Sequence, residues 1–256
     1  MFFILSMGRA GTMMLSELLN GVQDVVVKHE PDSMDVKLVG LRHGDSFGTS
    51  LDGLLRARFD RVRALHPQAA VYGEVNSYLR YEAEWLRSVL DARVLFVCRD
   101  GRDFVRSAFG RTIYTDRDGQ MTILPRDDDP ASADWSRYDR FEKLCWYWAH
   151  TNAMLLDQIG DPIQMERALN DYEYFESRIL KELDLEISKD VWSAEVSRPR
   201  NTSRANARKE TVKRLLRMER SGPRPTLSHW SKWDVAQTER FWEIAGPVME
   251  RLGYSR

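Results

Sequence analysis

The residues best suited to chemistry form a basic turn between two glycines near the start of the chain. Gly8, Arg9, Ala10, Gly11 and Thr12 follow a short apolar run and precede a stretch of helical character. Glycine lets the backbone approach a ligand closely, and the free N–H groups of a helix's first turn point toward an anion. Arg9 and Thr12 add a cationic donor and a hydroxyl donor. The turn therefore predicts a phosphate-binding loop.

A second candidate phosphate site lies farther along the chain. Residues 92–98 form an apolar run without alternation, which is typical of a buried parallel strand. The run ends at Arg99, and Ser107 follows eight residues later within the expected helix 104–109. Arginine offers a planar fork of donors to a phosphate, and a serine on the following helix can reach the same oxygens. Arg99 and Ser107 together predict a second phosphate site.

Strands and helices alternate along the chain, and these elements must position the two sites. The alternation predicts an α/β fold with a mostly parallel central sheet and helices on both faces. Ligands bind such sheets at the carboxyl ends of the strands, where both candidate sites fall. The expected strands are 2–6, 25–28, 70–73, 92–98 and 163–166, and the expected helices are 11–20, 51–65, 78–90, 104–109, 137–158, 172–183, 206–219 and 235–252.

Length and composition favour one ordinary globular domain. The 256 residues include 43% hydrophobic and 30% charged residues, and the net charge is −1. A net charge so close to zero argues against a general nucleic-acid binder. Two cysteines, Cys98 and Cys145, support neither a disulfide framework nor a metal site. No apolar run reaches the ~18 residues that span a bilayer, and no secretory signal is visible, so we expect a cytoplasmic protein.

The glycine turn differs from the phosphate loop of P-loop nucleotide triphosphatases. That loop needs four residues between its glycines and then a lysine, whereas two residues separate Gly8 from Gly11 and no lysine follows. The turn instead resembles the 5'-phosphosulfate loop of sulfotransferases that use 3'-phosphoadenosine 5'-phosphosulfate (PAPS). Arg99 and Ser107 resemble the pair that holds the 3'-phosphate of the nucleotide in that family.

Weaker similarity to the same family extends over nearly the whole chain. Ala10 and Met13 depart from the family's pattern, which often has hydroxyl residues at these positions. The resemblance implies a three-layer, P-loop-like sulfotransferase domain over residues 1–256. It also implies that the chain uses PAPS and releases 3',5'-adenosine bisphosphate (PAP), needs no metal, and acts on a small-molecule or carbohydrate acceptor. The residues that carry this similarity include His29-Glu30-Pro31, 72–76, 230–233 and 252–254, and the loop residues implied to bind the nucleotide are Gly8, Arg9, Ala10, Gly11, Thr12 and Met13.

The family also places a basic C-terminal segment on the nucleotide. Residues 198–224 contain ten lysines or arginines, of which about half fit the outer face of a solvated helix. Asn201, Arg204 and Lys232 are the candidates for further contacts with the 3'-phosphate. Residues 115–135 and 198–225 are the expected lids over the acceptor. The basic run has no interleaved aromatic residues, which argues against nucleic-acid binding.

Sulfuryl transfer needs a base for the acceptor's proton and positive charge around the leaving phosphate. Tyrosine- and carbohydrate-modifying members use a glutamate beyond the loop, and Glu30 lies eighteen residues beyond Thr12. His29 is an alternative base, because phenol- and steroid-modifying members use a histidine. Glu74, which follows another expected strand, is a third candidate. Arg9 would bridge the 5'-phosphosulfate and offset the charge that grows on the bridging oxygen.

Two other functions stay open on the sequence. A P-loop-like nucleotide kinase would share the strand, the glycine turn and the helix, although it would also need a lysine and an aspartate magnesium site. A catalytically silent member of the fold would keep Arg99 and Ser107 to bind nucleotide and would tolerate loss of the base. The residues select neither a particular acceptor nor an oligomeric state.

Overall fold

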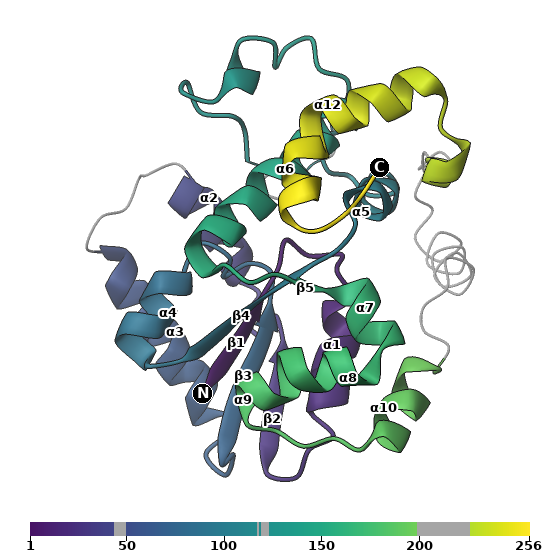
Figure 1. Ribbon diagram of the computed structural model, residues 1–256. Helices are drawn as coiled ribbons and strands as arrows, with labels where there is room; N and C mark the ends of the chain where they lie inside the picture. Colours follow the sequence, from purple (N-terminus) through teal and green to yellow (C-terminus); the bar gives the residue numbers. More distant parts are fainter. Residues whose placement is uncertain (44–49, 117, 119–122, 199–225) are drawn as a thin grey trace, which may run out of the picture.

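A five-stranded parallel sheet forms the centre of the molecule (Figure 1). The computed structural model describes residues 1–43, 50–116, 118, 123–198 and 226–256. The spatial order of the strands is β2-β3-β1-β4-β5, and every neighbouring pair is parallel. The strand that precedes the glycine turn, β1, is therefore central. The strands are β1 (Phe2–Leu5), β2 (Val25–His29), β3 (Val71–Asn76), β4 (Arg93–Cys98) and β5 (Ile163–Gln164).

Helices cover both faces of this sheet, which confirms the predicted three-layer α/β architecture (Figure 1). Alternate side chains of β1 pack against the helices on opposite faces of the sheet, because successive residues of a strand point to opposite faces. Phe3 and Leu5 pack into one core, and Phe2 and Ile4 pack into the other. The first core includes residues of α3 (Ser50–Ala64), α4 (Ala83–Leu90), α5 (Gly101–Phe109), α6 (Arg140–Ile159) and α12 (Val235–Arg251), and the second includes residues of α1 (Thr12–Leu19), α7 (Met165–Asn170), α8 (Tyr172–Phe175), α9 (Lys181–Leu183) and α10 (Lys189–Val196).

The longest helix, α6, has a complete set of local signals at its start. The Asp139 carboxylate accepts a hydrogen bond from the Glu142 N–H at 2.9 Å, and the Glu142 carboxylate accepts one from the Asp139 N–H at 2.6 Å. This reciprocal capping box satisfies backbone donors that the first turn leaves free. The buried face of α6 packs against α5 and α12, above the carboxyl ends of the strands (Figure 1).

Several element boundaries differ from the sequence prediction. Helices α2 (Asp35–His43) and α10 were not expected, and the predicted strand 163–166 ends at Gln164 because Met165 begins α7. The helix predicted from Tyr78 begins only at Ala83, since a polar turn follows β3. The predicted helix 172–183 is present as α8, a π-helical turn and α9 in succession. The predicted helix 206–219 lies outside the described residues.

The polar excursion after α5 is tied to other parts of the molecule. It contains a short 3₁₀ helix, Pro130–Ser132, and its Leu124 carbonyl lies 2.5 Å from His43 Nε2 at the end of α2. Arg126 donates to the His43 carbonyl at 2.7 Å. Asp129 accepts a hydrogen bond from the Trp146 indole of α6 at 3.0 Å. The described part of the predicted lid 115–135 is thus anchored to α2 and α6. None of the helices in the described ranges is both long and apolar enough to cross a bilayer.

Candidate functional site

The glycine turn between β1 and α1 has the backbone of an anion-binding loop. Gly8, Arg9 and Gly11 have φ values of +82°, +56° and +78°, which lie in the left-handed region. Glycine adopts this region without strain, whereas Arg9 is held there by its surroundings. Consecutive left-handed and right-handed residues turn backbone N–H groups inward to form a concave nest. Gly11 precedes α1 and offers no capping side chain, so the first N–H groups of the helix face the same loop.

The structure brings the two predicted phosphate sites side by side. Strands β1 and β4 are neighbours, so the loop after β1 lies beside the start of α5. Arg9 Nε donates to the Ser107 hydroxyl at 3.0 Å, and Arg99 Nη1 donates to the Arg9 carbonyl at 2.8 Å. Three residues from two separate predictions are therefore in direct contact at the carboxyl edge of the sheet.

Positive charge is concentrated at this contact. The pKa of Arg9 is lowered, first by desolvation among the surrounding atoms and then by the charges of Arg111 and Arg99, while Glu30 opposes the shift. Like charges held this close are costly unless an anion joins them. Asp103 lies 3.9 Å from an Arg99 nitrogen, which is at the limit of an ion pair. The sequence analysis missed Arg111, which lies two residues beyond the end of α5, the helix that carries Ser107.

His29 and Glu30 also lie beside the loop. His29 Nε2 is 2.8 Å from Thr12 Oγ1, and His29 Nδ1 is 3.9 Å from Glu30 Oε2. Both side chains are partly exposed, at 24% and 21%. Glu30 has a φ of +45°, a strained conformation for this residue type, and it accepts a hydrogen bond from the Ser77 hydroxyl. The end of β2 therefore presents a carboxylate and an imidazole next to the phosphate loop.

The third candidate base, Glu74, has a different environment. It is fully buried within β3, and Arg58 donates to its two oxygens at 2.5 and 2.7 Å. The Tyr72 hydroxyl and the Asn76 amide also donate to it, at 2.8 and 3.0 Å. Asp35 shares the Arg58 guanidinium at 2.5 and 2.9 Å. The structure thus places Glu74 in a hydrogen-bonded network under the sheet edge and not at the loop surface.

This network sets the ionisation of its members. Burial alone would lower the pKa of Arg58, but the hydrogen bonds and charges of Glu74 and Asp35 outweigh it, so the pKa is raised. Burial raises the pKa of the Tyr72 phenol, and the charge of Glu74 raises it further. Arg58 and Tyr72 therefore stay protonated, and both serve as donors to the buried carboxylates.

The other residues predicted to bind the nucleotide differ in burial and in their place in the fold. Ala10 is buried under the loop and Met13 is half exposed on α1. Lys232 is exposed on the 3₁₀ helix Trp230–Lys232, which contacts α5. Asn201 and Arg204 lie outside the described residues, as does nearly all of the predicted lid 198–225.

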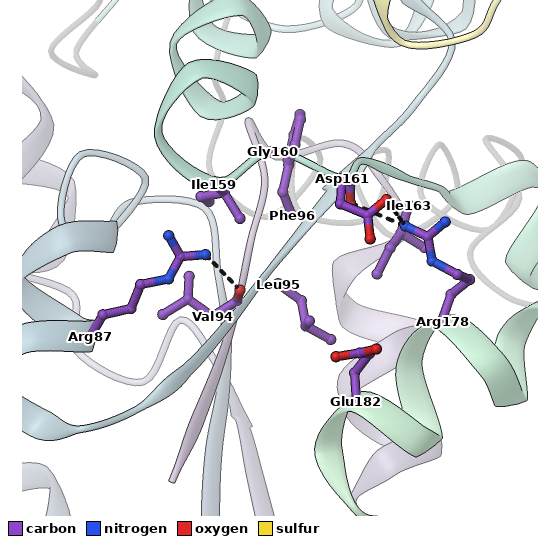
Figure 2. A pocket seen from close by; sticks show the side chains of 10 residues that line it. All are labelled: Arg87, Val94, Leu95, Phe96, Ile159, Gly160, Asp161, Ile163, Arg178 and Glu182. Carbon is purple, nitrogen blue, oxygen red and sulfur yellow. Dashed lines mark hydrogen bonds and ion pairs between the residues drawn. The ribbon is translucent and has the colours of Figure 1, made fainter.

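A small recess of about 180 Å³ lies elsewhere, along the edge of β4 next to β5 (Figure 2). Three of its charged side chains have partners. Arg178 forms an ion pair with Asp161 at 2.7 Å, and Arg87 donates to the Val94 carbonyl at 3.3 Å. No residue predicted to act on a nucleotide or an acceptor lines this recess. Its lining residues are Arg87, Val94, Leu95, Phe96, Ile159, Gly160, Asp161, Ile163, Arg178 and Glu182.

Solved structures with a similar fold are sulfotransferases. A sulfotransferase domain from the curacin biosynthetic pathway matches with a TM-score of 0.50 and 12% identity, over 99% of this chain and 97% of that chain. Mouse sulfotransferase SULT7A1, solved in complex with PAP, matches with a TM-score of 0.53 and 14% identity, over 97% of this chain and 84% of that chain. No protein-family model and no curated protein matches the sequence. The chain therefore has the fold of the sulfotransferases, as the sequence predicted.

Proposed function

We propose that this chain is a PAPS-dependent sulfotransferase that moves a sulfuryl group to a hydroxyl or amine of an acceptor. The observation that carries the proposal is the contact of Arg9, Arg99 and Ser107 beside the glycine loop. A nucleotide with phosphates at both its 3' and 5' positions needs two anion sites close together, and the two candidate sites at this edge of the sheet support that assignment. The likeness to solved sulfotransferases supports the same assignment.

The residues present fit a bound PAPS, which supplies the activated sulfuryl group. The glycine loop, the first turn of α1 and the Thr12 hydroxyl would hold the 5'-phosphosulfate. Arg99 and Ser107 would hold the 3'-phosphate. Arg9 can serve either group, because its backbone belongs to the loop while its guanidinium reaches Ser107. Fixed donors of this kind stabilise charge that develops on a leaving phosphate without reorganising during the reaction.

Glu30 is the proposed base. It is partly exposed beside the loop, and Oε1 is the oxygen that accepts the Ser77 hydrogen bond. Its other oxygen, Oε2, has His29 at 3.9 Å and is the better placed to take the acceptor's proton. His29, whose Nε2 contacts Thr12, would orient the first turn of α1. Glu74 is a poorer candidate, because both of its oxygens accept hydrogen bonds from Arg58.

Calorimetry with PAP and AMP tests the assignment. PAP should bind much more tightly than AMP, because only PAP has the 3'-phosphate. Arg99→Ala should weaken PAP binding by about 1.5 to 3 kcal/mol, the range for a hydrogen bond to a charged group, and should leave AMP binding nearly unchanged. Arg106→Ala is the matched control, since Arg106 is an exposed arginine of α5, the helix that follows Arg99. Equal affinities for PAP and AMP would overturn the proposal.

The acceptor is found by a separate experiment. Incubation with radiolabelled PAPS and pools of phenols, carbohydrates, amines and lipid alcohols should transfer label to one class. A small-molecule or carbohydrate acceptor belongs to the proposal because the resemblance implies it. A cytoplasmic location belongs to it as the sequence led us to expect. Transfer of phosphate from a labelled nucleoside triphosphate, supplied in place of PAPS, would favour the nucleotide kinase.

A further inference from the structure

We infer that Ser77 and Arg80 are positioning residues for Glu30: a buried arginine fixes the turn after β3, and the serine of that turn fixes the carboxylate. This inference rests on the proposed function, because it takes Glu30 as the base. Neither residue stood out in the sequence. Both follow from contacts between segments that are far apart along the chain.

Ser77 lies between the phosphate loop and Glu30. Its hydroxyl donates to Glu30 Oε1, and it also borders the loop, since a side chain added at Gly8 would lie 3.3 Å from Ser77 Oγ. The backbone N–H of Glu30 bonds to the Val75 carbonyl of β3 at 3.4 Å, so Glu30 still follows the register of the sheet. The strained φ of +45° at Glu30 is therefore imposed by β3 and by Ser77.

Arg80 is a buried cation whose recorded partners are neutral. Only 3% of the residue is exposed. Its Nη1 donates to the Ser77 carbonyl at 2.8 Å and its Nη2 donates to the Tyr147 hydroxyl at 2.8 Å. Its Nε has no hydrogen-bond partner among the described residues. None of the carboxylates in those residues lies within ion-pair distance of the guanidinium. A buried charge without an opposite partner costs stability. The rings of Tyr81 and Tyr147, whose centroids lie 5.8 and 5.7 Å from the guanidinium carbon, offset part of that cost. The two hydrogen bonds of Arg80 hold the Ser77 carbonyl and the Tyr147 hydroxyl in place.

Hydrogen bonds to the Glu74 network hold the same turn from its other side. Asn76 donates to Asp35 at 2.9 Å and to Glu74 at 3.0 Å, and its side-chain oxygen accepts the Tyr78 N–H at 2.9 Å. Two carboxylates share the single Arg58 guanidinium there, so that network has an excess negative charge. The turn that carries Ser77 thus lies between a buried anionic cluster and the buried Arg80 cation.

Tyr78 lies close to both charged groups. Burial raises the pKa of the Tyr78 phenol first, the Glu30 charge raises it further, and Arg80 opposes the shift. Arg80 acts on Glu30 through the Ser77 carbonyl that it holds, because the hydroxyl of the same serine bonds to the Glu30 carboxylate.

A double-mutant cycle between Ser77→Ala and Glu30→Gln tests the inference. The rate of sulfuryl transfer from PAPS is measured with an aliphatic alcohol, which needs a base, and with 4-nitrophenol at a pH where it is already ionised. PAPS hydrolysis, in which water is the acceptor, is followed as a third reaction that also needs a base. Ser77→Ala should lower the alcohol and water rates by about tenfold to a hundredfold, as expected for a misplaced catalytic group. In the Glu30→Gln background, adding Ser77→Ala should cause no further loss of either rate.

The second part of the experiment tests Arg80 with the variants Arg80→Met and Arg80→Lys and a matched control. Arg80→Met should reproduce the Ser77→Ala pattern, and Arg80→Lys should recover part of the rate because it restores the charge. Arg87→Met is the control, since Arg87 also donates to backbone carbonyls but lies at the recess beside β5. Transfer to ionised 4-nitrophenol should stay near the wild-type rate in every variant.

The outcomes separate this inference from the proposed function. Additive losses in the double variant, or equal losses with the alcohol and the ionised phenol, would show that Ser77 and Arg80 support the fold generally and would overturn the inference. A wild-type chain that binds no PAP and transfers no sulfuryl group to alcohol, phenol or water would instead overturn the proposed function.

Discussion

Glu30 lies directly after β2 and Glu74 lies in the neighbouring strand β3, and their surroundings differ in almost every respect. Glu30 is partly exposed and accepts a hydrogen bond from the Ser77 hydroxyl. Glu74 lies inside β3, is fully buried, and accepts hydrogen bonds from Arg58, Tyr72 and Asn76. The Glu74 oxygens already accept these hydrogen bonds inside the sheet, so they cannot reach the proton of an acceptor beside the loop. The donors around a glutamate, more than its distance from the loop in sequence, decide whether it can act as a base.

The largest effect should come from Glu30→Gln. This change keeps the shape of the side chain and removes its ability to take a proton. Turnover with an alcohol acceptor should fall by about a hundredfold to ten-thousandfold, the range for loss of a general base. Affinity for PAP and the free energy of unfolding should stay close to the wild-type values. Glu84→Gln, at an exposed position of α4, is the matched control.

A negligible effect of Glu30→Gln would transfer the role of base to His29 or Glu74. His29→Gln and Glu74→Gln measured beside it would then identify which. A loss of PAP affinity equal to the loss of turnover would instead make Glu30 a ligand of the nucleotide.

Glu74→Gln should lower the free energy of unfolding, whereas Glu30→Gln should lower turnover. Removing one partner of a buried ion pair costs about 3 to 5 kcal/mol, because it leaves the other partner incompletely compensated. Asp35 still pairs with Arg58, so we expect the lower end of that range. Urea unfolding measures the change, and Glu84→Gln again serves as the control. An unaltered free energy of unfolding combined with lost turnover would show that Glu74 takes part in the reaction.

The smallest expected effect is that of removing metal ions. A carboxylate beside a phosphate loop, such as Glu30, could in principle hold magnesium in a nucleotide kinase. In a sulfotransferase, Arg9 and the N-terminus of α1 supply the positive charge at that position. Sulfuryl transfer should therefore be unchanged after treatment with EDTA. Activity that disappears with the chelator and returns with magnesium would make Glu30 a metal ligand and would break its contrast with Glu74.

The features that the sequence predicted correctly depend on neighbours along the chain. The strand, the glycine turn and the helix at Gly8–Thr12 form one local unit, and so do β4, Arg99 and the helix with Ser107. The parallel order of the sheet then brings the two units together without further information. The three-layer fold followed from the alternation of elements for the same reason.

The features that the sequence did not reveal depend on contacts across the fold. Ser77 meets Glu30 across 47 positions of the chain, and Arg80 meets Tyr147 across 67. The helix α2 was missed because its residues, with a glycine at Gly40, have weak helical periodicity, while its buried Asp35 is held by Arg58 of α3. Glu74 looked like a site residue because a glutamate near the end of a strand has the same sequence signature in a core network as in a cleft.

The shortness of β5 leaves part of a sheet edge open. Among the described residues, β5 pairs only with Val97 and Cys98, so no strand lies beside Val94 and Leu95 on the outer edge of β4. An uncovered strand edge is a template for pairing with a foreign strand and so for aggregation. Here Arg87 donates to the Val94 carbonyl, and the Arg178–Asp161 pair adds charge beside the same edge (Figure 2). Charged side chains at an open edge disfavour strand pairing, so we expect these residues to oppose aggregation through β4.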